Sequence, residues 1–197
     1  MKRMMTAAVI AMLPAVSAGA VDFPAGRVVS GVTGDWNKDG RSDLALLVAP
    51  EDADSDEALL YLYLADKTHN LLRPVSEGAY SLWGNTSLDG MFGRDPELKA
   101  LDNGSLAVTT QNSGIGRNRW TQTVTIAWRD SQFIVAGFTY NWNDTLDIDN
   151  PDSNGSCDYN VLSGKYVLNG TSQNTAPSTV SLKDWSDEHG IKVCGVK

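Results

Sequence analysis

The sequence has only two histidines, and no Gly-x-Ser-x-Gly motif of the kind that presents a catalytic serine. Serine and cysteine hydrolases need a base beside the nucleophile, and histidine usually supplies it. His69 falls in a polar turn and His189 in a short C-terminal segment, so we expect both at the surface. Zinc sites need clustered His and Cys, which the sequence also lacks. These absences argue against a nucleophilic or zinc-dependent enzyme.

Positive charge is scarce, because 16 Lys and Arg stand against 24 Asp and Glu and give a formal net charge of −8. Binding to nucleic acid requires clustered basic residues that neutralise phosphates. We therefore expect no nucleic acid partner. Long hydrophobic runs are absent as well, and a membrane span needs roughly 20 consecutive apolar residues. We expect no membrane span.

The first 20 residues have the three parts of a secretory signal peptide. Lys2 and Arg3 form a positive start, residues 4–16 an apolar centre, and residues 18–20 a small-residue cleavage site. A membrane anchor is the alternative, but the apolar segment is short and contains Pro14. The sequence thus predicts a secreted or periplasmic protein that consists of one domain, residues 21–197. Loss of the two positive charges takes the formal net charge from −8 to −10.

The most informative motif is the stretch 35–43, which an apolar run at residues 44–48 follows directly. Oxygen-bearing side chains recur at every second position, a glycine follows, and a further carboxylate comes four residues after the third ligand. Calcium takes about six to eight oxygen ligands, and a glycine makes the sharp turn that brings later ligands round. The predicted metal ligands are the Arg41 carbonyl and four side chains, those of Asp35, Asn37, Asp39 and Asp43.

The twelfth place of this loop, which an EF-hand fills with Glu, is Leu46, and the loop leads into a strand pattern rather than a helix. The residues 34–48 resemble the FG-GAP or VCBS type of calcium loop, found in the integrin α-subunit propeller and in many secreted bacterial proteins. That resemblance implies Ca²⁺ as the cofactor. Four features follow one another along the mature chain: the calcium loop, Gly-Met-Phe-Gly at 90–93, and the stretches 128–133 and 155–165. This order is similar to that of a group of secreted bacterial proteins. The resemblance implies an extracytoplasmic location and an architecture, but no activity. A metal-free, Asx-rich hairpin turn is the alternative.

Residues 150–158 have the same spacing of oxygen-bearing side chains as residues 35–43, but fewer of these side chains are charged. Glycine again occupies the sixth place, at Gly155, and the oxygen-bearing positions are Asn150, Asp152, Asn154 and Asp158. Two carboxylates instead of three imply weaker calcium affinity. This stretch is either a weak second metal site or a plain Asx-rich turn.

The chain has two cysteines, Cys157 and Cys194, and both lie in the predicted mature part. Export to an oxidising compartment favours a disulfide between them, which would tie the last segment to the loop around Cys157. Two free thiols are the alternative.

Period-two alternation dominates the mature chain and predicts an all-β, single-domain antiparallel meander, either a sandwich or a propeller-like fragment. Strands are expected at residues 28–32, 44–48, 58–65, 98–101 and 105–110, and the clearest hairpin at 119–142. Residues 77–96 are expected to form a glycine-rich loop packed against the sheet. A short helical turn is expected near residues 182–189. A seven-bladed propeller is excluded by length.

Five aromatic residues could form a stacking platform for a carbohydrate, namely Trp83, Trp120, Trp128, Tyr140 and Trp142. Core packing is the alternative, and it is favoured for Trp120 and Trp128, which share a face with Val124 and Ile126. Paired carboxylates would suffice for a glycosidase, but no pair stands out.

The sequence therefore predicts a non-catalytic, calcium-binding secreted or periplasmic protein with a binding or scaffold role toward a protein or glycan ligand. The alternatives are a carbohydrate-binding module or polysaccharide hydrolase of the cell envelope, and a periplasmic inhibitor or immunity protein.

Overall fold

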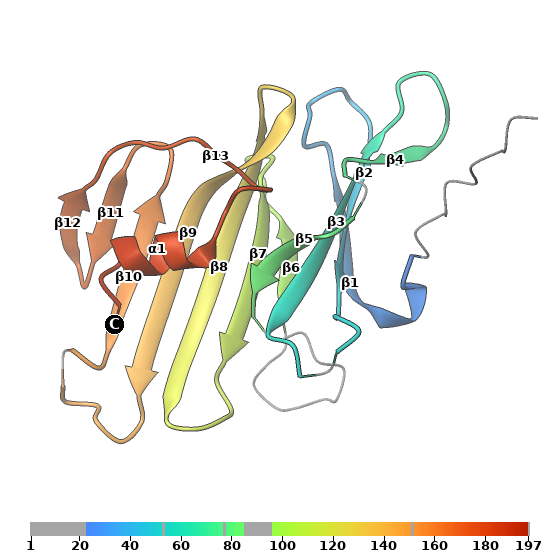
Figure 1. The fold of residues 1–197 in the computed structure, drawn as a ribbon. Coiled ribbons are helices and arrows are strands. Elements are labelled where there is room, and N and C mark those ends of the chain that lie inside the picture. The colour runs from blue at the N-terminus through green and yellow to red at the C-terminus, as the bar shows by residue number, and fades with distance from the viewer. Residues whose placement is uncertain (1–22, 53, 77, 85–95, 151, 197) are drawn as a thin grey trace, which may run out of the picture.

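The computed structural model describes residues 23–52, 54–76, 78–84, 96–150 and 152–196. The predicted signal peptide at 1–20 and most of the predicted loop at 77–96 lie outside the described residues. The described chain is all-β, with two antiparallel sheets and one short C-terminal helix (Figure 1). The predicted fold class is thus confirmed. Among the described residues, no helix combines the length and apolar character needed to cross a membrane.

The first sheet has five strands, in the order β1-β2-β3-β4, with β5 paired to the other part of β3. A short 3-10 helix, η1 (Ala25–Arg27), precedes it. The strands are β1 (Val28–Gly34), β2 (Asp43–Val48), β3 (Glu57–Ala65), β4 (Leu72–Pro74) and β5 (Tyr80–Trp83). Alternate residues of β2 and β3 are buried, because one face of this sheet covers the core.

The second sheet has eight strands, seven in the order β12-β11-β10-β9-β8-β7-β6 and the short β13 paired to β9. These strands are β6 (Glu97–Ala100), β7 (Leu106–Asn112), β8 (Asn118–Arg129), β9 (Gln132–Asp144), β10 (Gly155–Asn160), β11 (Lys165–Leu168), β12 (Thr171–Asn174) and β13 (Val180–Ser181). Neighbours along the chain are neighbours in the sheet, so the predicted meander holds for this half.

The β8–β9 hairpin forms the centre of the second sheet. Its two-residue turn, Asp130 and Ser131, has φ values of 49° and 62°, as a type I′ turn requires. Every second residue of β8, from Trp120 to Ile126, faces the core, while the threonines between them face the other way. This alternation is the reason that the sequence pattern identified the hairpin correctly.

A single hydrophobic cluster joins the two sheets. Leu47 and Leu60 of the first sheet are fully buried in the same cluster as Leu106 and Ile126 of the second. The C-terminal helix α1 (Asp187–Val193) lies across the face of the second sheet (Figure 1). A Cβ at Gly190 would lie 2.4 Å from the ring of Phe138, so only glycine lets the helix approach β9 this closely.

Three boundaries differ from the sequence expectation. Residues 80–83, expected within a loop, form β5 because they pair with β3. Residues 155–158, expected within a turn, form the start of β10 because they pair with β9. The helix begins at Asp187, later than expected, and its acidic first turn suits the positive end of the helix dipole.

Candidate functional site

Four aromatic side chains gather at one end of the second sheet. Trp120 and Trp142 are directly opposed on β8 and β9, and Tyr140 precedes Trp142 by two residues on the same face. The rings of Tyr140 and Trp142 stack with centroids 5.7 Å apart. Trp83, from β5 of the first sheet, stacks on Trp120 with centroids 4.1 Å apart and an interplanar angle of 25°. Two sheets therefore contribute to one aromatic cluster.

Hydrogen bonds fix the backbone of Trp83 over the second sheet. Its carbonyl oxygen accepts from Thr110 Oγ1 at 3.0 Å and from Gln122 Nε2 at 3.2 Å. Its N–H donates to the carboxylate of Asp187, which also accepts from the indole N–H of Trp185. Asp187 is only 7% exposed, and burial raises the pKa of its carboxyl group against the lowering effect of these bonds. Asp187 thus ties the helix to the tryptophan behind the cluster.

Trp142 lies against Gly155, the first residue of β10. A Cβ at Gly155 would lie 2.3 Å from the indole ring of Trp142, so a larger residue would push the ring out of its place. The predicted sixth place of a second calcium loop is therefore a contact site for an aromatic ring.

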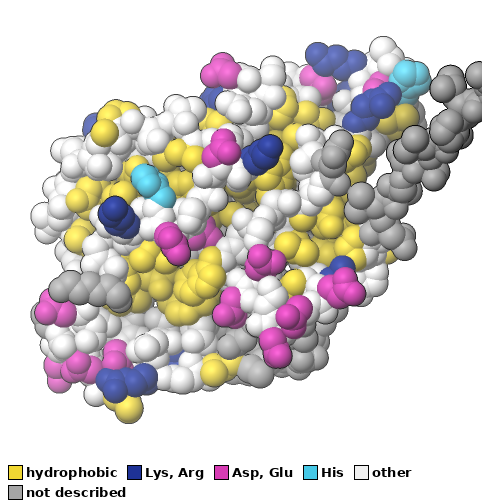
Figure 2. All heavy atoms as spheres, viewed as in Figure 1, with side chains coloured by type: hydrophobic (Ala, Val, Ile, Leu, Met, Phe, Trp, Pro, Cys, Tyr) yellow, Lys and Arg dark blue, Asp and Glu magenta, His cyan; other side chains and the backbone are white. Residues whose placement is uncertain are grey.

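A cavity of about 490 Å³ opens beside these rings, and it is lined by Trp120, Tyr140 and Trp142. We call this cavity, backed by Trp83, the aromatic cleft. The turn after β11 and the C-terminal residues 194–196 complete its wall. Figure 2 shows hydrophobic side chains gathered on the face that carries α1. The cleft has the size of a small-molecule site, and it combines three aromatic side chains with polar ones.

Polar side chains surround the aromatic floor, among them Asn118, Arg119, Asn143, Asp144, Asp152 and Asn169. Asp144 forms an ion pair with Arg117, and the hydrogen bond from Arg117 holds the pKa of the Asp144 carboxyl below its usual value. Arg119 differs from Arg117, because its Nη1 is buried and has no hydrogen-bond partner.

The structure brings together four of the five aromatic residues that the sequence suggested for a sugar platform. The fifth, Trp128, lies at the far end of β8 and packs on Phe133 with centroids 4.9 Å apart. Trp120 and Trp128 both pack against the core while keeping part of their surface exposed. The sequence pattern does not point to Asp187. Its carboxylate holds the cluster in place by accepting from the N–H of Trp83, which is 104 residues away in the sequence.

The predicted calcium loop, residues 35–43, joins β1 to β2. Asp35 accepts from the backbone N–H groups of Asp39 and Gly40 at 3.0 and 2.9 Å. Asn37 Oδ1 accepts from the same Asp39 N–H at 3.0 Å, and Asp39 Oδ1 accepts from Arg41 N–H at 3.0 Å. Gly40 has a φ of +83°. The first three predicted ligands thus converge on one turn.

The fourth side chain of that set, Asp43, faces the interior. It is fully buried, at 0% exposed, and its two oxygens accept from the N–H groups of Trp36 and Ala65 at 3.0 and 2.9 Å. Burial raises the pKa of the Asp43 carboxyl, and the two hydrogen bonds oppose this rise. The Arg41 side chain donates to the carbonyls of Asp66 and Lys67 in the turn before β4. Asp43 and Arg41 therefore anchor the loop to its surroundings.

Within the described part of the chain, no three or more His, Cys, Asp or Glu side chains gather closely enough to hold a metal ion. Side-chain oxygens of Asp35, Asn37 and Asp39 each accept a backbone N–H. Each such oxygen has two lone pairs, so one lone pair per oxygen remains for another partner. Asp35, Asn37 and Asp39 present oxygens of the hard type that calcium prefers, whereas both oxygens of Asp43 accept from backbone N–H groups. Calcium binding stays a prediction.

The second predicted metal stretch is divided between a turn and a strand. Asn154 donates to the carbonyls of Asp147, Ile148 and Asn150, and its Oδ1 accepts from the Asp144 N–H. Asp158 lies on β10 and accepts from Thr139 Oγ1 at 3.1 Å. Asn150 Oδ1 accepts from the N–H of Asp152 at 3.0 Å. This arrangement gives the turn a structural explanation, and metal binding there stays a prediction.

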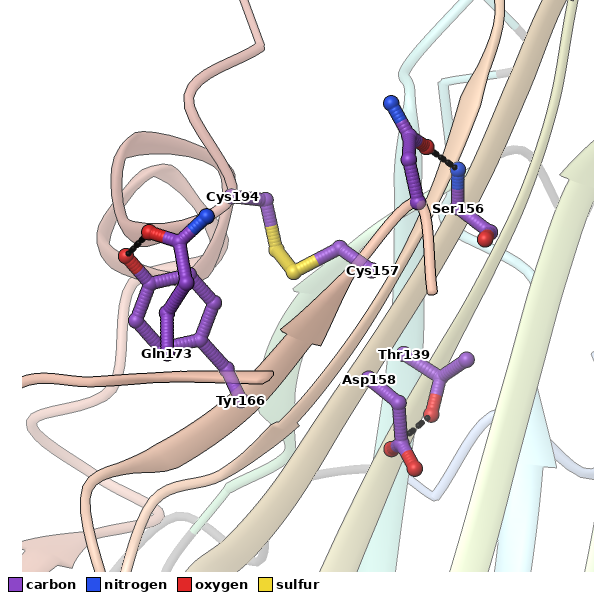
Figure 3. Close-up of a disulfide and its surroundings, with 8 residues drawn as sticks. Thr139, Ser156, Cys157, Asp158, Tyr166, Gln173 and Cys194 are labelled. Atoms are coloured by element: carbon purple, nitrogen blue, oxygen red, sulfur yellow. Dashed lines mark hydrogen bonds between the residues drawn. A yellow bond between two sulfur atoms is a disulfide. The ribbon is translucent and has the colours of Figure 1, made fainter. Parts of the chain in front are cut away.

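The predicted disulfide is present and joins Cys157 of β10 to Cys194, directly after α1 (Figure 3). Both cysteines are 1% exposed. The bond fixes the C-terminal residues that form one wall of the aromatic cleft.

The fold and site together define an all-β protein of two sheets with an aromatic cleft at one end of the larger sheet. No protein-family model, no curated protein and no solved structure matches the chain.

Proposed function

We propose that this chain is an exported, non-catalytic binding protein that takes a carbohydrate in the aromatic cleft. The observation that carries this proposal is the arrangement of Trp120, Tyr140 and Trp142 on one cavity wall. One face of a sugar ring presents apolar C–H groups, which pack on the electron-rich face of an aromatic ring. The amide and charged side chains of the rim supply hydrogen-bond partners for sugar hydroxyls.

The carboxyl group of Asp144 favours binding over hydrolysis. A glycosidase requires a carboxylic acid that is protonated at working pH, which a raised pKa provides. Arg117 lowers the pKa of the Asp144 carboxyl instead. A lowered pKa makes Asp144 a good hydrogen-bond acceptor and a poor general acid. Export of the protein, to the exterior or the periplasm, rests on the leader pattern at 1–20 and agrees with the Cys157–Cys194 disulfide.

The test is a titration of the mature chain with neutral and acidic oligosaccharides chosen from a glycan array. Intrinsic tryptophan fluorescence is the signal that reports binding. Trp142→Ala removes one ring of the wall, and we expect it to weaken binding at least about fivefold, by analogy with base-stacking sites. Trp128→Ala is the matched control, because Trp128 is also half-buried on the same hairpin but lies outside the cleft. Absence of binding to every glycan, or equal effects of the two substitutions, contradicts the proposal.

Calcium binding at residues 35–43 is the second candidate, as a stabilising element rather than part of the sugar site. It is supported by the convergence of Asp35, Asn37 and Asp39 on one turn, since these oxygens are of the hard type that calcium prefers. An ion bound only by the folded chain raises its stability by mass action. We expect Ca²⁺ to raise the melting temperature, EGTA to reverse the rise, and Asp39→Ala to abolish both responses. A melting temperature that is the same in Ca²⁺ and EGTA assigns the loop to a metal-free turn.

A further inference from the structure

Two large apolar side chains lie open to water on the loop between β9 and β10. Leu146 is 77% exposed and Ile148 is 70% exposed, whereas the next most exposed large hydrophobic residue of the described chain, Leu71, is 45% exposed. Single exposed apolar residues are ordinary on protein surfaces, but a neighbouring pair of this exposure gains by burial against a partner. We call Leu146 and Ile148 the apolar tip.

Hydrogen bonds hold the loop in the shape that keeps the apolar tip outward. The side-chain amide of Asn154 donates to the carbonyl oxygens of Asp147 and Ile148 at 2.8 and 3.2 Å. The N–H of Leu146 donates to Asp144 Oδ1 at 2.9 Å. A loop that is already ordered gives up little conformational freedom when a partner covers it. The apolar tip is therefore preorganised for contact.

Negative charge follows the apolar tip along the loop. Asp149 and Asp152 are exposed, and neither forms an ion pair with any residue that the structure describes. Asp144 differs, because Arg117 neutralises it. A surface that covers the apolar tip must therefore be apolar at its centre and positively charged at its edge.

A pocket of that kind lies at the opposite end of the molecule. Its volume is about 480 Å³, and its apolar lining residues are Leu64, Ala65, Pro74, Val75 and Trp128. Lys67 and Arg73 line it as well, and its one acidic residue, Asp66, forms an ion pair with Arg73. Lys67 has no ion-pair partner within the described ranges. The pocket thus has a net positive charge, and we call it the basic pocket.

The apolar tip and the basic pocket cannot meet within one molecule. The basic pocket includes Ser131, in the turn between β8 and β9. The loop that carries the apolar tip follows β9 at the other end of the same long hairpin, as Figure 1 shows. A contact between the two surfaces therefore requires two copies of the chain.

We propose that this protein associates with itself head to tail, with the apolar tip of one copy seated in the basic pocket of the next. The proposal is independent of the carbohydrate-binding function. Asp149 and Asp152 of one copy face the positively charged edge of the other, and this complementarity sets the orientation. The two surfaces differ, so the contact is heterologous, and each copy can make it twice. The contact is small, so the association is weak.

The first experiment is analytical ultracentrifugation of the pure mature chain at concentrations from about 10 μM to about 1 mM. We expect the weight-average mass to rise above that of the monomer within this range and to pass that of a dimer at the top of it. A mass that stays at the monomer value throughout overturns the proposal and leaves the apolar tip to a different partner.

Two variants remove one surface each. Leu146→Ser/Ile148→Ser removes the apolar tip, and Lys67→Glu/Pro74→Asp makes the basic pocket acidic. All four residues are exposed, so we expect both variants to fold, which thermal melting verifies. Each variant alone should associate at least about tenfold more weakly than the native chain. Val167→Ser is the matched control, because Val167 is 40% exposed on β11 and belongs to neither surface; it should associate as the native chain does.

An equimolar mixture of the two variants is the decisive measurement. Each mixed pair retains one intact apolar tip and one intact basic pocket, so the mixture should form a dimer and nothing larger. A mixture that remains monomeric overturns the proposal. So does a basic-pocket variant that associates like the native chain, since the apolar tip would then contact another surface, such as a second tip. If one variant fails to fold, the concentration series of the native chain and the other variant still decide the question.

Discussion

Removal of the Cys157–Cys194 disulfide should destabilise the protein by a predictable amount. The bridge spans a sequence separation of 37, and the chain-entropy relation for a loop of this length gives about 4 kcal/mol of stabilisation. Small domains have a total unfolding free energy of about 5–15 kcal/mol, so this loss is a large fraction of the whole. The double variant Cys157→Ala/Cys194→Ala is the direct test, with urea unfolding followed by far-UV circular dichroism.

Two comparisons separate the entropy of the loop from the packing of the sulfurs. Both cysteines are 1% exposed, so the alanine variant also loses buried atoms, which adds to its destabilisation. The native protein with its disulfide reduced keeps those atoms and loses only the covalent link. We expect the reduced protein to lose about 3–4 kcal/mol and the double variant somewhat more. A loss below about 1 kcal/mol in both forms refutes the reasoning, because the link would then hardly restrict the unfolded chain.

Three further predictions concern single residues. Asp43→Asn should lower the unfolding free energy by about 1–3 kcal/mol, because one of the N–H groups of Trp36 and Ala65 loses its acceptor; if the loss disappears in EGTA, Asp43 acts through a metal instead. Gly190→Ala should destabilise by about 1–3 kcal/mol through overpacking on Phe138, whereas Gly26→Ala, which meets no atom within 4 Å, should change stability little. In the folded protein the pKa of the Asp187 carboxyl is raised above 3.8, the ordinary value for an aspartate. The stability that protonated Asp187 contributes is therefore fully present below pH 3.8 and is lost as pH rises through the folded pKa. The difference in unfolding free energy between the native protein and Asp187→Asn, measured from low pH upward, should follow this course, and a difference that does not change with pH contradicts it.

The strands that the sequence predicts well are those in which local pattern and tertiary pairing agree. Residues 119–142 alternate between core and solvent along nearly their whole length, so period two identifies the β8–β9 hairpin. β5 is different, since residues 80–83 are neighboured by glycines and become a strand only by pairing with β3. The strands β10 and β12 are largely polar, short turns separate them from β11, and their pairing partners decide their structure.

The candidate site was predictable in its residue types and not in its assembly. The tryptophan and tyrosine residues suggest a stacking surface, but the alternation that favours core packing for both Trp120 and Trp128 does not separate Trp120, which lines the cleft, from Trp128, which lies outside it. Cross-strand pairing places Trp142 beside Trp120, and the return of the first sheet over the second places Trp83 behind them. The role of Asp187 depends on a contact with Trp83 across a separation of 104 residues. Such contacts follow from the fold as a whole, and local patterns do not encode them.

The burial of Trp36 has a consequence for engineering of this chain. Trp36 lies between the first two predicted calcium ligands, yet it is 2% exposed and its ring contacts Phe133 of the other sheet with centroids 6.5 Å apart. A peptide tag or fusion partner inserted into residues 35–43 would therefore pull apart the two halves of the molecule, although the loop resembles an ordinary surface turn in composition. Asp130 and Ser131 differ from this loop, because both of their side chains are exposed at the tip of the β8–β9 hairpin.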